Sequence, residues 1–258
     1  MVVIRFKMVL TKKTIKISAI VQARMGSMRL PGKVLMGICG KPALKHIVER
    51  LRFSKLINQV ILAIPDTKEN DILEKFAQEN SVGCYRGSES EVLERVYLAA
   101  KENNCDIIVG ITADNPLIDP GIIDLVIEKH MGAKADYSST FYPCRFLPLG
   151  LDVEVLTFYA LENAYKNAKE EYYREHVTSY FYKNPNIFKI NGTKLPKDLE
   201  DPSLRLTLDT KEDLELISRI YASLYQPGGI FKTEQILGLL KVNPELREIN
   251  AHIIQKVK

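Results

Sequence analysis

The segment 22–33, QARMGSMRLPGK, contains the residue types that bind phosphate groups. It places two glycines, one serine and three cations directly after a short apolar run at 17–21. Glycine lets the backbone approach a ligand closely, its N–H groups can contact phosphate oxygens, and arginine and lysine offset the charge of a triphosphate. We therefore expect this loop to bind a polyphosphate. The expected contacts are Ala23, Arg24, Gly26, Ser27, Arg29 and Lys33.

Two well-known phosphate loops do not match this segment. The dinucleotide fingerprint needs GxGxxG, which is absent, and the Walker A loop needs four residues between Gly and Gly-Lys, followed by Ser or Thr. Here five residues separate Gly26 from Gly32, and Val34 follows Lys33. A basic surface turn is the alternative interpretation. The coincidence of these residue types at the carboxyl end of an expected strand favours phosphate binding.

An acidic residue occupies the equivalent place after another apolar run. Asp114 follows the run 107–111 and precedes Pro116 in a turn. A carboxylate that faces a site rich in cations is well suited to bind a hard divalent cation such as Mg²⁺. Asp is also favoured in turns for conformational reasons, and this is the competing interpretation.

The elements that must position these residues alternate between strand and helix patterns. Short apolar runs at 17–21, 60–64, 82–85 and 107–111 predict strands, and helical spacing predicts helices at 43–53 and 69–78. Ser88 with Glu91 has the spacing of a capping box that opens a third helix. This order predicts an α/β fold with a mainly parallel, Rossmann-like sheet, helices on both faces, and ligands at the carboxyl ends of the strands.

The second half of the chain continues this alternation less regularly. We expect helices at 120–130, 158–169 and 172–182, and extended segments at 135–141, 151–155, 187–190 and 205–208. Thr210 with Asp213 predicts a helix to about residue 225, and Pro227-Gly228-Gly229 separates it from a final helical pair. The prediction is an extension at 1–14 and a single domain at 15–258, with a C-terminal helical segment from about 211.

Composition excludes several classes of protein. The chain has 258 residues, of which 46% are apolar and 26% charged, which is typical of a globular protein rather than a disordered or coiled-coil one. No apolar run reaches the roughly 18 residues of a membrane span. Four scattered cysteines show neither CxxC nor zinc spacing, and no local pattern supports a catalytic thiol. We expect a cytoplasmic protein without membrane contact.

Charge is unevenly distributed along the chain. The net charge is only +4, but the first 48 residues contain ten Lys or Arg and no Asp or Glu. A polyanion is therefore expected at the N-terminal segment, and either a nucleotide or a nucleic acid would fit. An RNA-binding module would need aromatic side chains among the cations for base stacking, and segment 12–45 has none. This favours a nucleotide over nucleic acid.

Several motifs of the chain resemble those of a known family. The segment ARMGSMRLPGKVL (23–35) is similar to the opening motif of the cytidylyltransferases that activate sugars for polysaccharides. The resemblance is strongest to the SpsF-type branch of spore-coat polysaccharide biosynthesis, with CMP-Kdo and acylneuraminate synthetases as relatives. It continues in order through RGS (86–88), TADNPLID (112–119), GLDVE (150–154), REHVT (174–178) and LTLDTKEDL (206–214), and it covers 17 to about 250.

The resemblance implies a reaction and a set of residues. A sugar hydroxyl, expected to belong to an acidic sugar, attacks the α-phosphorus of CTP, and pyrophosphate leaves; the product serves surface polysaccharide synthesis. Arg24, Arg29 and Lys33 would act with Mg²⁺ as the catalytic apparatus, and the protein needs no nucleophile of its own. Arg86 and Ser88 would also bind the nucleotide.

The family also implies a second metal ligand. Asp209 matches an Asp that binds Mg²⁺ together with the residue at the position of Asp114. Asp209 could instead cap the helix that follows it. Because Thr210 and Asp213 can cap that helix themselves, we favour Asp209 as a metal ligand.

The sugar side of the site is less well defined by sequence. Asp152 and Glu154 alternate with apolar residues, so both should point to one side of a strand. With them the resemblance places the sugar-binding residues Arg174, His176 and Arg205, although a solvated His176 is the competing interpretation. Homodimers are common in this family, so a homodimer is an expected form. The alternative functions are a nucleotidyltransferase with another nucleotide or acceptor, and a non-catalytic anion-binding or RNA-binding protein.

Overall fold

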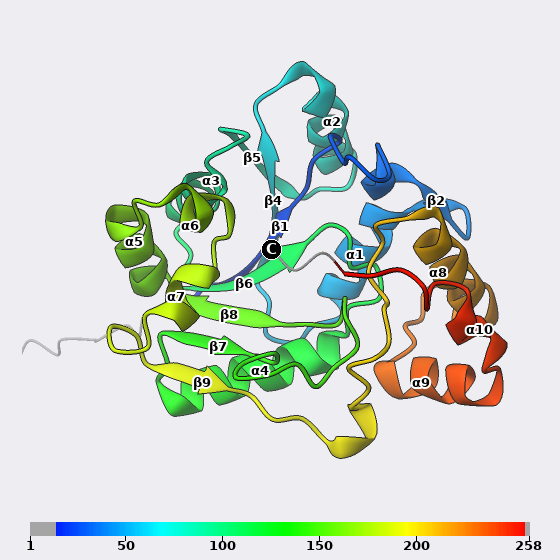
Figure 1. Cartoon of the computed structure of the whole chain (residues 1–258). Helices are drawn as coiled ribbons and strands as arrows, with labels where there is room; N and C mark the ends of the chain where they lie inside the picture. The colour runs from blue at the N-terminus through cyan, green and yellow to red at the C-terminus, as the bar shows by residue number, and fades with distance from the viewer. Residues whose placement is uncertain (1–13, 256–258) are drawn as a thin grey trace, which may run out of the picture.

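The computed structural model describes residues 14–255 and has one large sheet at its centre (Figure 1). The seven strands lie in the order β5-β4-β1-β6-β8-β7-β9. Their bounds are β1 Ile17–Gln22, β4 Gln59–Pro65, β5 Gly83–Gly87, β6 Ile107–Thr112, β7 Tyr137–Ser139, β8 Glu154–Thr157 and β9 Ile190–Gly192. The predicted α/β fold with a mainly parallel sheet is therefore confirmed.

The register of the sheet brings two predicted site segments to the same edge. β1 pairs in parallel with β4 on one side and with β6 on the other, and Gln22 lies opposite Thr112. The loops that follow β1 and β6 therefore begin side by side. β8 runs antiparallel to β6 and to β7, so the residues before β8, rather than those after it, reach this edge.

Helices cover both faces of the sheet, as predicted. One apolar cluster joins residues of β1 and β6 to α1 (Ala43–Arg52), α2 (Asp71–Glu79), α4 (Pro120–Ala133), α8 (Lys211–Leu224) and α9 (Thr233–Val242). The other cluster joins the opposite face to α3 (Val92–Glu102), α5 (Phe158–Asn167) and α7 (Ser179–Lys183). Ala19 and Val21 belong to the first cluster and Ile20 to the second, as a strand buried on both faces requires.

Several predicted boundaries are wrong. α3 begins at Val92 rather than directly after Ser88, although the Ser88 hydroxyl accepts the Glu91 N–H as the expected cap would. The helix expected at 172–182 is two short helices, α6 (Glu171–Glu175) and α7, since the backbone leaves the helical region at His176. The extended segment 205–208 forms only an isolated bridge between Leu149 and Arg205.

Short elements that the sequence did not reveal complete the chain. They are a hairpin of β2 (Gly37–Ile38) and β3 (Lys41–Pro42), and the 3-10 turns Lys33–Leu35, Lys68–Asn70 and Lys197–Leu199. α9 and α10 (Glu245–Glu248) are the predicted final helical pair, and with α8 they form the C-terminal helical segment. Residues 1–13, most of the predicted extension, lie outside the described residues. No helix within 14–255 has the length and apolar character needed to cross a membrane.

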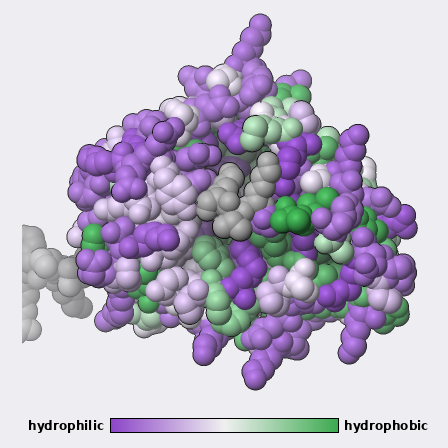
Figure 2. Space-filling model, in the orientation of Figure 1, coloured by the Kyte–Doolittle hydropathy of each residue, from purple (hydrophilic) through white to green (hydrophobic). Residues whose placement is uncertain are grey.

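The face seen in Figure 1 is largely polar. Figure 2 shows mainly hydrophilic residues on it, with hydrophobic ones in small separate groups. In this view α3, α5, α6 and α7 lie on one side of the sheet, and α1, α8, α9 and α10 on the other (Figure 1).

Candidate active site

The phosphate loop that follows β1 is held in shape by its own backbone and by one buried amide. The Met25 N–H donates to Asn70 Oδ1 at 2.9 Å, and Asn70 is fully buried. The Met25 carbonyl accepts the N–H groups of Ser27 at 2.9 Å and Gly32 at 3.0 Å. Gly32 has φ 70°, a left-handed conformation that glycine adopts without strain. The loop is therefore folded back so that Lys33, at its end, returns toward the strand edge.

Lys33 joins the two carboxylates that the sequence predicts as metal ligands. Its Nζ lies 2.8 Å from Asp114 Oδ2 and 2.7 Å from Asp209 Oδ1. Arg29, from the same loop, forms a second ion pair with Asp209 at 2.6 Å. The structure thus brings together two cations from the segment after β1, one carboxylate from the turn after β6, and one from the segment before α8.

Asp209 is free to take part because neighbouring residues cap α8. The Thr210 hydroxyl accepts the Asp213 N–H at 3.2 Å, and Asp213 Oδ2 accepts the Thr210 N–H at 2.9 Å, so the predicted capping box is confirmed. Burial alone would raise the pKa of Asp209, but Lys33, Arg29 and Arg205 together lower it below its usual value. Asp209 is therefore held as a carboxylate.

These two carboxylates fit a magnesium ion. Mg²⁺ is usually bound through one or two carboxylates, with water and substrate phosphates as its other ligands. Among residues 14–255 no group of three or more His, Cys, Asp or Glu side chains is arranged to hold a metal. Asp114 and Asp209, which share the Lys33 ammonium, match the sparser arrangement that is typical of a metal brought in with a nucleotide.

A cavity of about 220 Å³ opens beside these carboxylates. Its walls come from β6, β8 and the segments that precede β8 and α8, and they include two further acidic residues, Asp152 and Glu154. The residues that line it are Gly110, Thr112, Asp114, Asn115, Phe141, Leu149, Gly150, Asp152, Glu154, Thr207, Asp209 and Gln255. The predicted metal ligands and two of the predicted sugar-binding residues therefore share one cavity.

The backbone around this cavity depends on Gly150. Its φ is 101°, and a Cβ placed on it would lie 2.6 Å from Thr207 N and 2.7 Å from the Leu206 carbonyl carbon. Real Cβ atoms do not come that close to backbone. This contact fixes the segment that leads to Asp209 against the segment that leads to Asp152.

Arg174 and His176 are not among the residues that line the cavity, and their contact with a sugar stays a prediction. The Arg174 guanidinium pairs with Glu91, just before α3, and donates to the Tyr165 carbonyl at 3.4 Å. The His176 ring packs against Tyr172, with ring centroids 4.8 Å apart. The Arg174 side chain is thus directed toward α3 and α5, next to the break between α6 and α7.

Arg205 is bonded to protein groups beside the cavity, and its contact with a sugar stays a prediction. Its buried guanidinium binds Asp213 Oδ1 at 2.8 Å and Asp209 Oδ2 at 3.0 Å. It also donates to Gln255, which lines the cavity. Arg205 therefore holds Asp209 in position through an ion pair, and its guanidinium is hydrogen-bonded to protein groups.

The two predicted nucleotide contacts beyond the phosphate loop have local partners. Arg86, in β5, forms ion pairs with Asp66 at 2.9 Å, Asp71 at 2.8 Å and Glu74 at 2.7 Å. Ser88 lies in the loop between β5 and α3, where its carbonyl accepts from Arg95. Their contact with a nucleotide stays a prediction.

Arg95 is a cation near the phosphate loop that sequence reasoning missed. It is buried in α3, and burial, with the nearby charge of Arg24, lowers its pKa to about 10. Its Nε is buried and has no hydrogen-bond partner among the described residues. Arg24 forms no ion pair within 14–255. Two arginines that repel each other are suited to a shared anionic ligand. In the sequence Arg95 could not be distinguished from a surface residue of an amphipathic helix.

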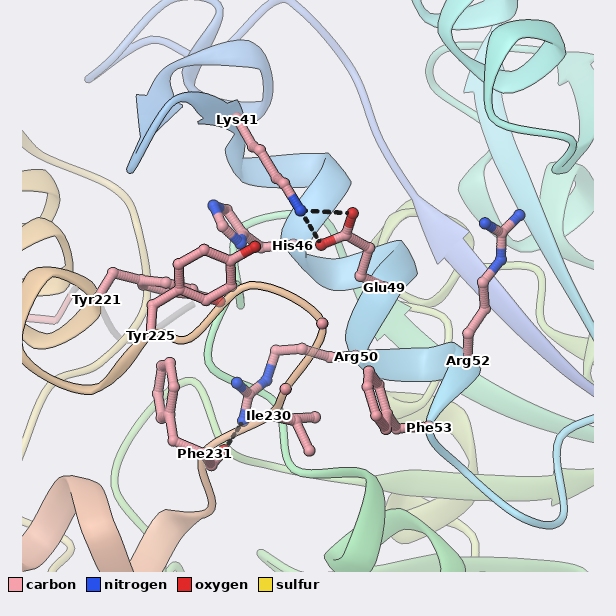
Figure 3. A pocket seen from close by; sticks show the side chains of 12 residues that line it. Lys41, His46, Glu49, Arg50, Arg52, Phe53, Tyr221, Tyr225, Ile230 and Phe231 are labelled. Atoms are coloured by element: carbon pink, nitrogen blue, oxygen red, sulfur yellow. Dashed lines mark hydrogen bonds and ion pairs between the residues drawn. The ribbon is translucent and has the colours of Figure 1, made fainter.

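A separate cavity of about 300 Å³ lies between α1, the end of α8 and the loop before α9 (Figure 3). None of the predicted site residues lines it. Its polar groups are already bonded: Arg50 Nε donates to the Ile118 carbonyl at 2.5 Å, and the Tyr221 hydroxyl to the Pro116 carbonyl at 2.5 Å. Both acceptors belong to the turn that carries Asp114, so these two hydrogen bonds hold that turn in place.

Comparisons with known proteins show the family of this chain. The family model described as cytidylyltransferase matches residues 18–237. An uncharacterized protein of Methanocaldococcus jannaschii is 41% identical over 93% of this chain and 97% of its own length. The spore coat polysaccharide biosynthesis protein SpsF of Bacillus subtilis is 33% identical, over 88% and 94% respectively. A cytidylyltransferase structure from Leptospira borgpetersenii superposes with a TM-score of 0.85 at 31% identity and covers 95% of this chain and 100% of its own. The chain belongs to the cytidylyltransferase family.

Proposed function

We propose that this protein transfers CMP from CTP to a sugar hydroxyl, with Mg²⁺ held by Asp114 and Asp209, and releases pyrophosphate. The observation that carries the proposal is the Lys33 ammonium, which contacts both carboxylates at the end of a loop rich in cations. A triphosphate with a divalent cation supplies the negative and positive charges that this loop and these carboxylates would bind.

The metal ion and the cations of the loop would act on different phosphates of the nucleotide. Mg²⁺ would neutralise phosphate charge and make the α-phosphorus more electrophilic. The backbone N–H groups of the loop, with Arg24, Arg29 and Lys33, would hold the β- and γ-phosphates and stabilise the charge of the departing pyrophosphate. Arg205 keeps Asp209 in place, which preserves the geometry that an in-line displacement needs.

The acceptor is proposed to be an acidic sugar, as in the CMP-Kdo and acylneuraminate synthetases that the motifs resemble. The described lining of the cavity contains no Lys or Arg. Arg145, which pairs with Asp152 and stacks 5.9 Å from Phe141, is the candidate cation for a sugar carboxylate. The similarity to SpsF supports a role in surface polysaccharide synthesis.

Pyrophosphate release tests the proposal. The purified protein is incubated with Mg²⁺, each of CTP, UTP, ATP and GTP, and a panel of acidic, neutral and amino sugars. We expect release that needs CTP, Mg²⁺ and an acidic sugar together. Release that occurs with CTP and only a neutral or amino sugar would still support CMP transfer, but it would reject an acidic sugar as the acceptor. Release that prefers another nucleotide would reject the proposal for CTP.

A further inference from the structure

Glu154 lies at the start of β8, next to a position on the sheet that no side chain covers. The register places it opposite Gly110 of β6 and Ser139 of β7. Gly110 has no side chain, and a Cβ added to it would meet no atom within 4 Å. Gly110 and Glu154 both line the cavity that contains Asp114 and Asp209. A ligand over Gly110 would therefore lie against the Glu154 carboxylate.

Buried neighbours fix the direction of this carboxylate. The Tyr137 hydroxyl donates to Glu154 Oε1, and Tyr137 is fully buried with its ring stacked on Phe181, the centroids 5.2 Å apart. Thr178 adds a side-chain hydrogen bond to the same carboxylate. Glu154 is thus held by one strand and one inter-helix segment, and it faces the cavity without an ion pair among the described residues.

The charges around Glu154 come from several elements. Burial is the largest influence on the pKa of Glu154 and raises it, and the carboxylate of Asp152 raises it further. Tyr137, Thr178 and Arg145 lower it, and the resulting pKa is about 7. Tyr182 of α7 also faces it. Asp114 and Asp209, which the Lys33 ammonium joins, line the same cavity. A carboxylate with a pKa near the working pH is well suited to accept a proton.

We propose that Glu154 is the general base of the reaction, which rests on the CMP transfer proposed above. The acceptor O–H bond breaks as its oxygen forms the new bond to the α-phosphorus, and the proton passes to the Glu154 carboxylate. The bond from the α-phosphorus to the bridging oxygen breaks, and its electron pair leaves with pyrophosphate. The neutral carboxyl of Glu154 then returns its proton to water.

The test measures pyrophosphate release against pH for the wild type, Glu154→Gln and the exposed control Glu128→Gln. We expect Glu154→Gln to lower kcat about 100-fold or more, the usual contribution of a general base, with the KM for CTP unchanged within about twofold. The wild-type kcat should rise with pH through about 7, and this rise should be absent in Glu154→Gln. Glu128→Gln should match the wild type.

A second variant separates proton transfer from a structural role. Tyr137→Phe keeps the ring and removes the hydroxyl that lowers the pKa of Glu154, so the rise in kcat should move to higher pH while the enzyme remains active. An unchanged rise in both variants, or an effect of Glu154→Gln on the KM for the sugar alone, would overturn the assignment of the base. A wild type that releases no pyrophosphate from CTP with any sugar would instead reject the proposed function itself.

Discussion

Lys33 and Asp209 form an ion pair of 2.7 Å although 176 positions separate them in the sequence. The same ammonium lies 2.8 Å from Asp114. One lysine from the first loop of the sheet thus gathers carboxylates from the turn after β6 and from the segment before α8. We infer that the loop and the two carboxylates act as a unit, and the first two predictions test this.

The carboxylates should show non-additive effects. Asp114→Asn and Asp209→Asn should each nearly abolish pyrophosphate release, because each removes a charged ligand of the same cation. The double variant should be little worse than either single one, since residues that act as a unit do not contribute independently. Steady-state kcat/KM for the three variants gives the answer. The exposed control Asp198→Asn should retain full activity, and strictly multiplicative losses would show that Asp114 and Asp209 have separate roles.

The cations of the phosphate loop should contribute to binding of CTP. A charge-assisted hydrogen bond contributes about 1.5–3 kcal/mol, so Arg29→Ala and Lys33→Ala should each weaken CTP binding by roughly tenfold or more. Calorimetric titration with CTP and Mg²⁺ measures this directly. Lys183→Ala, an exposed cation on α7, serves as the matched control. An affinity within about twofold of the wild type in both loop variants would contradict the assignment of this loop.

The sequence was most informative where apolar runs were short and bounded by clear turns. The predictions at 17–21, 60–64 and 107–111 match β1, β4 and β6, because a strand buried on both faces is continuously apolar. The segment 205–208 looked like a strand because Leu206 and Leu208 alternate with polar residues. Leu206 and Leu208 are indeed buried, but they pack as irregular chain, and periodicity cannot distinguish these two cases.

The candidate site was predictable only where a motif carried it. Lys33 and Asp114 meet because β1 and β6 are neighbours and their loops begin at one edge of the sheet, as the alternation of strands and helices implies. Asp209 reaches them from irregular chain, and only the motif indicated its place. The break between α6 and α7, beside which Arg174 and His176 lie, could not be predicted because it depends on tertiary packing. Tyr137 and Arg145 were not predicted as site residues. Tyr137 matters because it contacts Glu154, and Arg145 because it contacts Asp152, and only the fold brings these side chains together.

Gly150 should be essential to the fold of the site. Gly150→Ala would place a methyl group 2.6 Å from Thr207 N at a φ of 101°, and this strain should lower the free energy of unfolding by at least about 2 kcal/mol. Urea denaturation measures the change. Gly132→Ala is the matched control, since Gly132 lies in α4 with nothing within 4 Å of the added Cβ, and helix propensity predicts equal or higher stability. Equal stability of the Gly150 variant and the wild type would contradict the close approach of these two segments.

A buried histidine should make the protein less stable in mild acid. Burial lowers the pKa of His130 to about 4, below its usual value of 6.5, and its Nδ1 lies 2.9 Å from the Ser138 hydroxyl. Between these two pH values the unfolded chain takes up a proton that the folded one does not. The free energy of unfolding should therefore fall as the pH drops from about 6.5 toward 4, by up to about 1.4 kcal/mol per pH unit from this group.

Urea denaturation at several pH values between 4 and 7 checks this, with His130→Gln and the exposed control His252→Gln. His130→Gln should reduce the slope of stability against pH, whatever its effect on stability at pH 7. His252→Gln should keep the wild-type slope. A slope that does not change on substitution of His130 would show that other groups cause the loss of stability in acid.

Calorimetric titration of the full chain with CTP, with and without Mg²⁺, tests most directly whether the loop and the two carboxylates form a metal-dependent CTP site. We expect CTP to bind at least about tenfold more tightly with Mg²⁺ than without it, and more tightly than UTP, ATP or GTP under the same conditions. Asp209→Asn should remove the effect of Mg²⁺. Binding of CTP that is equally strong without Mg²⁺, or that Asp209→Asn leaves unchanged, would contradict this account of the site.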